Sequence, residues 1–195
     1  MQDDQGIDQK KRRLLQLAGA LGAVGAVGGA APFASSLYPS RSARLKGQPV
    51  EVDLSAMKTG EQKTVMWRGK PIWIIKRDEN ILAKLSDNDN LLRDPASKVA
   101  QQPNYAQNPY RSIHPEFLVL IGVCTHLGCA PTYRPEKGAV DESWPGGFFC
   151  SCHGSKFDLA GRVFDGVPAP TNLEVPPHHF KSDNVLIIGS ESDNE

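Results

Sequence analysis

All four cysteines of this chain lie in two short segments that each also contain a histidine, and no other feature restricts its fold and chemistry as much. The first box is CTHLGC, residues 124–129, and the second box is CSCHGS, residues 150–155. Together they hold two of the five histidines. Four clustered cysteines in 195 residues are too few for a disulfide-rich scaffold. They indicate a metal site, a redox pair or both.

Three kinds of site could use these side chains. A structural zinc ion would need only four of the six candidate ligands, and Cys-x-His-x2-Cys is not a usual zinc-finger spacing. Two plain disulfides, or a thiol redox pair, would leave both histidines unexplained, and Cys150-x-Cys152 lacks the Cys-x-x-Cys spacing of thiol oxidoreductases. A [2Fe–2S] cluster with two thiolate and two imidazole ligands takes one Cys and one His from each box. The two remaining cysteines could form a disulfide between the boxes, so this interpretation accounts for all six side chains.

With CTHLGC and CSCHGS together, the chain resembles the Rieske iron–sulfur protein family, in the form that has a disulfide between the boxes. The resemblance implies one [2Fe–2S] cluster. One iron would be bound by the two thiolates of Cys124 and Cys150, and the other by the imidazoles of His126 and His153. The implied disulfide joins Cys129 and Cys152.

The family also has a proline-containing loop that covers the cluster, and GVPAP at residues 166–170 resembles it. Proline fixes φ and stiffens such a loop, here with Gly166, Pro168 and Pro170. Without the two boxes, a generic proline turn would be the default interpretation. The resemblance further implies that Leu127 lies on a docking surface, whereas a lone leucine would otherwise be assigned to the core.

The mixed ligand set explains the redox range of such clusters. Replacing two thiolates by neutral imidazoles removes negative charge, so an electron is added more easily and the potential lies at roughly −150 to +300 mV rather than about −400 mV. A ligating imidazole also keeps a second ring nitrogen that can exchange a proton. The resemblance implies that His153 hydrogen-bonds quinol and accepts its proton.

Two further positions resemble those that tune the cluster. Hydrogen bonds to cluster sulfurs favour the reduced state. Ser155 matches the family serine that donates to a bridging sulfide, while Phe157 stands where many high-potential members have a tyrosine that donates to a cysteine sulfur. We therefore predict a potential some tens of millivolts below that of a tyrosine-bearing relative.

The N-terminal region is predicted to be a membrane anchor. Residues 1–13 form a polar cytoplasmic tail that ends in Arg12-Arg13, and the uncharged, Ala- and Gly-rich residues 14–37 are long enough to span a bilayer. Twin arginines before a weakly apolar stretch resemble a twin-arginine export signal, although Lys11 replaces the usual Ser or Thr. Because no clean A-x-A cleavage site follows, we predict that the segment is retained. Residues 38–49 are predicted to be a flexible hinge linker.

Residues 50–195 are predicted to form an all-β, Rieske-type antiparallel barrel or sandwich, with an inserted cluster-binding part at about 120–172. Residues 63–77 predict a hairpin turning at Arg68-Gly69, and 116–124 a buried strand entering the first box. Residues 161–166 predict a short strand, and 173–189 a closing hairpin turning at 182–184. Residues 86–112 show no clear period and are predicted to be an insertion with some helix. The remaining histidines receive no ligand role and are expected on the surface or in the hairpin: His114, His178 and His179.

The resemblance extends to the Rieske subunit of the bacterial quinol:cytochrome c oxidoreductase. It implies that the chain takes an electron from ubiquinol at cytochrome b and carries it to cytochrome c1 by movement of the head on the linker. The chain would then be part of an oxidoreductase, not catalytic alone, in a dimeric complex. It would cross the bacterial inner membrane once with its cluster in the periplasm, where disulfides persist.

Two alternatives remain open from the sequence. One is the small Rieske subunit of a periplasmic molybdenum oxidase such as arsenite oxidase, in which the signal is cleaved and the domain is soluble. The other is a binding module with a structural zinc ion. A formal net charge of zero argues against a nucleic-acid partner.

Overall fold

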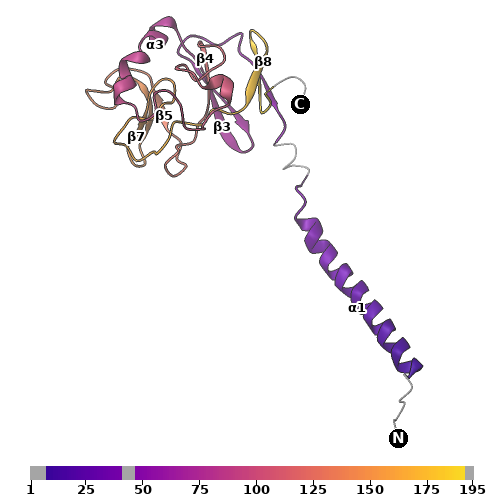
Figure 1. Ribbon diagram of the computed structural model, residues 1–195. Helices are drawn as coiled ribbons and strands as arrows, with labels where there is room; N and C mark the ends of the chain where they lie inside the picture. The colour runs from indigo at the N-terminus through magenta and orange to yellow at the C-terminus, as the bar shows by residue number, and fades with distance from the viewer. Residues whose placement is uncertain (1–7, 41–46, 192–195) are drawn as a thin grey trace. The chain divides into compact units, whose positions relative to one another are not determined.

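The chain divides into two compact units, Met1–Leu45 and Lys46–Glu195 (Figure 1). The structure, a computed structural model, describes residues 8–40 and 47–191. Residues 1–7 of the predicted tail and 41–46 of the predicted linker lie outside these ranges. The tail, linker and domain boundaries inferred from the sequence therefore stay predictions.

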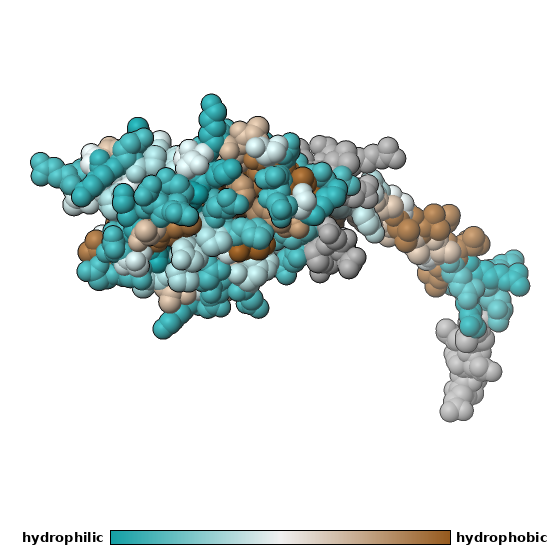
Figure 2. All heavy atoms as spheres, turned by 90° about the horizontal axis from the view of Figure 1, so that it is seen from above, coloured by the Kyte–Doolittle hydropathy of each residue, from teal (hydrophilic) through white to brown (hydrophobic). Residues whose placement is uncertain are grey.

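The first unit contains one helix, α1 (Gln9–Ser36), which begins before the predicted anchor segment 14–37. Asp8 caps it, since its carboxylate accepts hydrogen bonds from the N–H groups of Lys10 and Lys11 at 3.0 and 3.3 Å. Every residue of α1 is exposed. Apolar residues dominate its surface in Figure 2, whereas polar residues dominate the visible face of the second unit. It is the one helix among the described residues that is long and apolar enough to cross a membrane.

The described residues of the second unit, the head, form three antiparallel sheets of three strands each. The first has the order β1-β9-β8, formed by β1 (Val50–Asp53), β9 (Val185–Ile188) and β8 (His178–Ser182). The second has the order β2-β3-β4, formed by β2 (Gln62–Trp67), β3 (Lys70–Lys76) and β4 (Phe117–Ile121). The third has the order β5-β6-β7, formed by β5 (Thr132–Arg134), β6 (Gly147–Cys150) and β7 (Ser155–Phe157). This confirms the all-β prediction, including both predicted hairpins.

The β2–β3 hairpin turns where the sequence predicts. Arg68 and Gly69 both have positive φ, 48° and 74°, as a type I′ turn requires. Trp67 pairs with Lys70 across the two-residue loop. A turn of this type matches the twist of the flanking strands, so it fixes the register of β2 against β3.

In the second sheet, the central sheet, strands β3 and β4 are buried on both faces, which explains their continuous apolar runs. One face, including Ile72, Ile74 and Val119, packs into the base core with β1 and β9. The other face, including Trp73 and Leu120, packs into the site core, which also contains Cys124 and Cys150. Successive residues of a strand point to opposite sides, so this one sheet joins the base of the head to the site.

The segment between β3 and β4 contains short helices, as predicted for the insertion at residues 86–112. These are α3 (Glu79–Ala83), just before it, and the 3₁₀ turns η1 (Ser86–Leu91) and η2 (Asn104–Ala106). One prediction was wrong in detail. Residues 161–166 form no strand: Val163 and Phe164 make only isolated bridges, to Phe157 and Leu92. His178 lies on the predicted hairpin but is fully buried, because its ring packs against Tyr105 and Phe180.

Candidate metal centre

The two boxes form a pair of similar loops. The first follows β4, and the second joins β6 to β7. In each, the carbonyl of the leading cysteine accepts a hydrogen bond from a glycine N–H four residues later: Gly128 to Cys124 at 3.0 Å, and Gly154 to Cys150 at 2.9 Å. Both glycines have φ near +80°, a conformation that glycine adopts without strain. Each box therefore turns tightly after its leading cysteine.

The two histidines of the boxes face each other. The ring centroids of His126 and His153 are 4.8 Å apart and their planes are nearly perpendicular, at 89°. His126 is half-buried and His153 is exposed. An exposed ring on this loop can contact a partner while its other nitrogen is directed to a metal.

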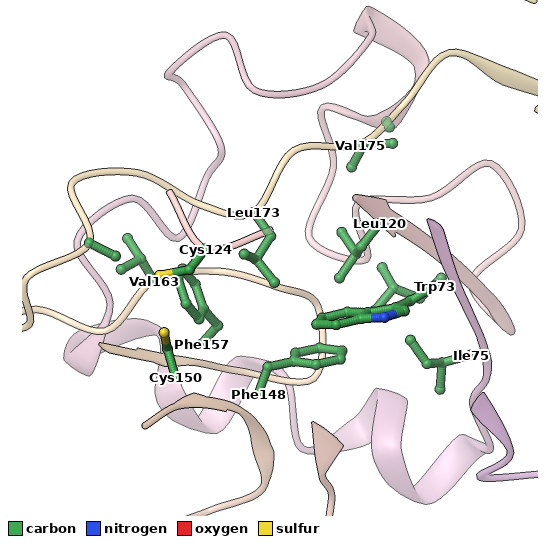
Figure 3. Packing of buried hydrophobic residues seen from close by; sticks show 13 residues of the cluster. Trp73, Ile75, Leu120, Cys124, Phe148, Cys150, Phe157, Val163, Leu173 and Val175 are labelled. Atoms are coloured by element: carbon green, nitrogen blue, oxygen red, sulfur yellow. The ribbon is translucent and has the colours of Figure 1, made fainter. Parts of the chain in front are cut away.

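The two leading cysteines are free thiols on the inner side of the loops. Cys124 and Cys150 are each 2% exposed and pack in the site core with Phe157 and Phe148 (Figure 3). Burial, followed by the hydrogen bond with the neighbouring Cys124 side chain, raises the pKa of the Cys150 thiol. A thiol in such a place is unreactive without a metal, and a metal ion would be needed to hold it as a thiolate.

The other two cysteines, Cys129 and Cys152, form a disulfide that joins the boxes across 23 residues of sequence. This is the pairing that the resemblance implies. The sulfurs of Cys129, Cys150 and Cys152 all lie within 4.8 Å of one another. Because two of these sulfurs are bonded to each other, their proximity places the disulfide beside the free Cys150 thiol.

The donor set fits a mixed-ligand iron–sulfur cluster. After the disulfide is formed, two buried thiols and two facing imidazoles remain at the junction of the boxes. Sulfur donors come from the interior and nitrogen donors from the outer side. That separation is what a cluster needs when one iron takes two thiolates and the other two imidazoles.

The GVPAP loop, residues 166–170, and the following Thr171 are tied to the two boxes. The N–H of Ala169 donates to the hydroxyl of Ser155 at 3.0 Å, and the hydroxyl of Thr125 donates to the carbonyl of Thr171 at 2.7 Å. Gly166, Pro168 and Pro170 are exposed, whereas Ala169 is fully buried. The loop thus forms a third wall beside the two boxes.

The remaining predicted residues lie as follows. Leu127 is 71% exposed at the tip of the first box. Ser155 is fully buried, and its hydroxyl accepts from Ala169 while keeping its own proton for a further partner. Phe157 is fully buried in the same core as the two free thiols. His114 lies away from the boxes and packs against Phe180, with 4.5 Å between ring centroids.

Sequence reasoning missed the polar side chains that hold the loops. Arg93, in the insertion, donates to two carbonyls of the GVPAP loop, and Arg111 donates to carbonyls on both sides of the site core. Thr125 was also missed. These contacts join segments that are far apart in the chain, so no local spacing or periodicity of the sequence predicts them.

Known proteins share these features. A sequence profile described as the Rieske [2Fe-2S] domain matches residues 96–177, which include both boxes and the GVPAP loop. The ubiquinol-cytochrome c reductase iron-sulfur subunit of Allochromatium vinosum is 53% identical over 96% of this chain and 92% of its own length. The subunit of the same name from Bradyrhizobium diazoefficiens is 44% identical over 87% of this chain and 90% of its own length.

A chain of a solved structure, titled as a hyperthermophilic respiratory Complex III, is 29% identical. It aligns with a TM-score of 0.47 and covers 87% of this chain and 96% of its own. The identity to the two bacterial subunits, over nearly their whole length, decides the assignment. This chain belongs to the Rieske [2Fe–2S] protein family, among the ubiquinol-cytochrome c reductase iron-sulfur subunits.

Proposed function

We propose that this chain is the Rieske electron-transfer subunit of a bacterial quinol:cytochrome c reductase. The observation that carries the proposal is the identity of 53% to a subunit of that name, extending over 96% of the chain and so including α1 as well as the head. The chain would act as part of an oxidoreductase complex and would not be catalytic alone. The molybdenum-oxidase alternative finds no support among these relatives.

Within this proposal, the cluster ligands are Cys124, His126, Cys150 and His153. The bound [2Fe–2S] cluster supplies reversible one-electron chemistry. The protein supplies an apolar inner wall around the thiols and an open outer side at the imidazoles. His153, as the more exposed histidine, would accept a hydrogen bond from quinol and then its proton. The buried Ser155 hydroxyl is available to donate to a cluster sulfur, whereas Phe157 has no donor.

The tip of the head suits docking onto a membrane subunit. Neither box contains a charged residue, and Leu127 presents a large apolar side chain directly after His126 in the first box. An uncharged tip with one apolar projection can enter an apolar depression at low desolvation cost. We assign this surface to cytochrome b, where ubiquinol would reach His153.

The other parts of the chain would deliver the electron. Helix α1 would cross the bacterial inner membrane once, with residues 1–13 in the cytoplasm and the head in the periplasm. Residues 38–49 would act as a hinge that lets the head move from cytochrome b to cytochrome c1. A tether of this length keeps the head at high effective concentration at both stations. The parent complex would be a dimer.

The test is purification through a tag on this chain from detergent-solubilised membranes. The proposal predicts co-purification of cytochromes b and c1 and electron transfer from ubiquinol to cytochrome c that depends on the chain. Co-purification with a molybdenum protein from the soluble fraction, with a mature N-terminus past residue 35, would contradict it.

A pair of variants tests the docking surface within that complex. Leu127→Asp should lower quinol oxidation by about tenfold or more, because it places a charge in the apolar contact. The matched control is Met66→Asp, since Met66 is 60% exposed on β2, outside the boxes. Equal quinol oxidation by the two variants would show that Leu127 is not part of the docking surface.

A further inference from the structure

The segment at residues 86–112, to which the sequence assigned no role, lies against the GVPAP loop. Its backbone bonds to the residues that lead into the loop: the N–H of Arg93 donates to the carbonyl of Val163 at 3.0 Å, and the N–H of Asp165 donates to the carbonyl of Leu91 at 2.9 Å. Leu92 and Phe164 form the bridge between them. The insertion therefore fixes one end of the loop.

The side chain of Arg93 holds the loop itself. One guanidinium nitrogen, Nη1, donates to the carbonyl of Ala169 at 2.8 Å, and the other, Nη2, donates to the carbonyl of Val167 at 3.2 Å. The Nε group contacts the carboxylate of Asp165 at 3.5 Å. The Arg93 side chain is 35% exposed, so it reaches the loop from its outer side.

Both accepting carbonyls belong to peptide bonds that precede prolines, Pro168 and Pro170. Prolines have no N–H group, so the loop has few donors with which to bond to its surroundings. Its carbonyls must supply most of its attachments. A planar guanidinium with several donors in a fixed arrangement is suited to binding two carbonyls that lie two residues apart.

Ala169 connects this clamp to the metal centre. Its carbonyl accepts from Arg93, while its N–H donates to the hydroxyl of Ser155. Ser155, the last residue of the second box, is fully buried at the start of β7. The oxygen of Ser155 is thus held from the loop side, and its hydroxyl proton stays available to donate to another acceptor.

We propose that Arg93 is a positioning residue that holds the GVPAP loop closed over the metal centre and, through Ala169, fixes the orientation of the Ser155 hydroxyl. The statement that Arg93 holds the loop rests on the hydrogen bonds described above alone. The statement that Arg93 fixes the orientation of the Ser155 hydroxyl rests on the proposed function, because it takes the acceptor of the Ser155 proton to be a cluster sulfur. The insertion thereby gains a role as the support of the loop.

The first readout is hydrogen exchange of the loop in the purified complex. Of residues 166–170, only Gly166, Val167 and Ala169 carry an amide N–H, so a peptide covering them reports few sites. Arg93→Gln should speed exchange of the Ala169 amide by about tenfold to a hundredfold, as expected for loss of hydrogen bonds from a charged donor. Arg93→Lys, which can bond to one carbonyl at a time, should give an intermediate rate.

Asp165→Asn is the matched control. It removes the 3.5 Å ion pair but leaves both carbonyl contacts of Arg93 intact, so loop exchange should stay within about twofold of the unchanged protein. Unchanged exchange in Arg93→Gln would overturn the proposal. If that variant does not fold, unchanged exchange in Arg93→Lys would overturn it equally.

The second readout is the midpoint potential of the bound cluster, measured by redox titration. A freed Ser155 hydroxyl should lower the potential in Arg93→Gln, with partial recovery in Arg93→Lys and none of this shift in Asp165→Asn. A loop that opens without any change in potential would overturn the link to Ser155. Neither readout requires turnover. A complex that does not oxidise quinol would contradict the proposed function, but loop exchange and midpoint potential could still be measured in it and would still test the role of Arg93.

Discussion

The base and the site half of the head are held together by different means. The base consists of the β1-β9-β8 sheet and one face of the central sheet, which includes β2. It packs through alternating apolar side chains such as Ile72, Ile74 and Leu186. The site half consists of short strands and long loops, and buried arginines cross-link it. Arg111 donates to the carbonyl of Leu173 at 2.6 Å, and Arg162 donates to that of Leu85 at 2.6 Å.

The difference arises because the site half carries the loops with the metal ligands, whereas the base does not. Loops that carry metal ligands leave many backbone carbonyls without a neighbouring strand, and a buried carbonyl without a donor is costly. A guanidinium can satisfy several at once. Burial lowers the pKa of Arg111 to about 10, which still leaves it charged at neutral pH. The site half therefore depends on a few buried polar residues in addition to its apolar core, whereas the base packs mainly through apolar side chains.

The largest expected effect in the site half is loss of the cluster itself. Cys124→Ala should abolish cluster binding, because the remaining thiol cannot hold an iron alone. Iron and acid-labile sulfide per chain measure the outcome. The control is Ser151→Ala, which alters an exposed residue of the second box. A Cys124→Ala protein with full iron and sulfide content would refute the ligand assignment.

The comparison between the halves is tested next by one substitution in each. Arg111→Met should lower the free energy of unfolding by roughly 3–5 kcal/mol, because it removes the Arg111 donor from buried carbonyls such as those of Leu173 and Ala160. Ile74→Val, in the base, should cost only about 0.5–1.5 kcal/mol. Denaturant unfolding measures both. Equal costs would show that the two halves are stabilised alike.

His178 tests the contact between the halves, since it lies on β8 and its ring packs against Tyr105 of the insertion at a centroid distance of 5.5 Å. Burial lowers its pKa to about 4, with a smaller contribution from the neighbouring His179. The unfolded chain therefore binds this proton first as pH falls. The contribution of neutral, buried His178 to the free energy of unfolding is complete above about pH 6.5. It is lost as pH decreases toward 4, and the loss amounts to up to about 3 kcal/mol.

The variant His178→Gln should remove this part of the pH dependence. The free energy of unfolding measured between pH 6.5 and 4.5 would then fall less steeply than in the unchanged protein. Other titrating groups are common to both proteins, so the difference between the two slopes isolates His178. Identical slopes would mean that its proton is bound equally in the folded and unfolded states.

The smallest effect concerns the tuning of the cluster. Phe157→Tyr introduces a hydroxyl in the core that contains Cys124 and Cys150. One added hydrogen bond to a cysteine sulfur is worth about 1 kcal/mol. For one electron this corresponds to a rise in potential of about 40 mV. A redox titration that shows no rise would mean that the hydroxyl finds another partner or none.

The base was largely predictable because its signals are local. The apolar run of β4 and the Arg68-Gly69 turn predict the central sheet directly. The candidate metal ligands were also local, since two boxes contain every cysteine. The supports of the site were not predictable, because Arg93, Arg111 and Arg162 act on carbonyls that only the fold brings near. The same reason explains why 161–166 was wrongly expected as a strand: its carbonyls and N–H groups bond to several different segments, such as Lys156, Leu91 and Leu173, and not to one continuous partner strand.

The central claim is that the boxes hold a mixed-ligand [2Fe–2S] cluster that meets quinol in a membrane complex. The most direct measurement is low-temperature EPR on dithionite-reduced membranes that contain this chain, with and without a quinol-site inhibitor. We predict a Rieske-type spectrum in the membrane fraction that shifts when the inhibitor is added. A spectrum confined to the soluble fraction and indifferent to the inhibitor, or zinc with no iron signal, would contradict the claim.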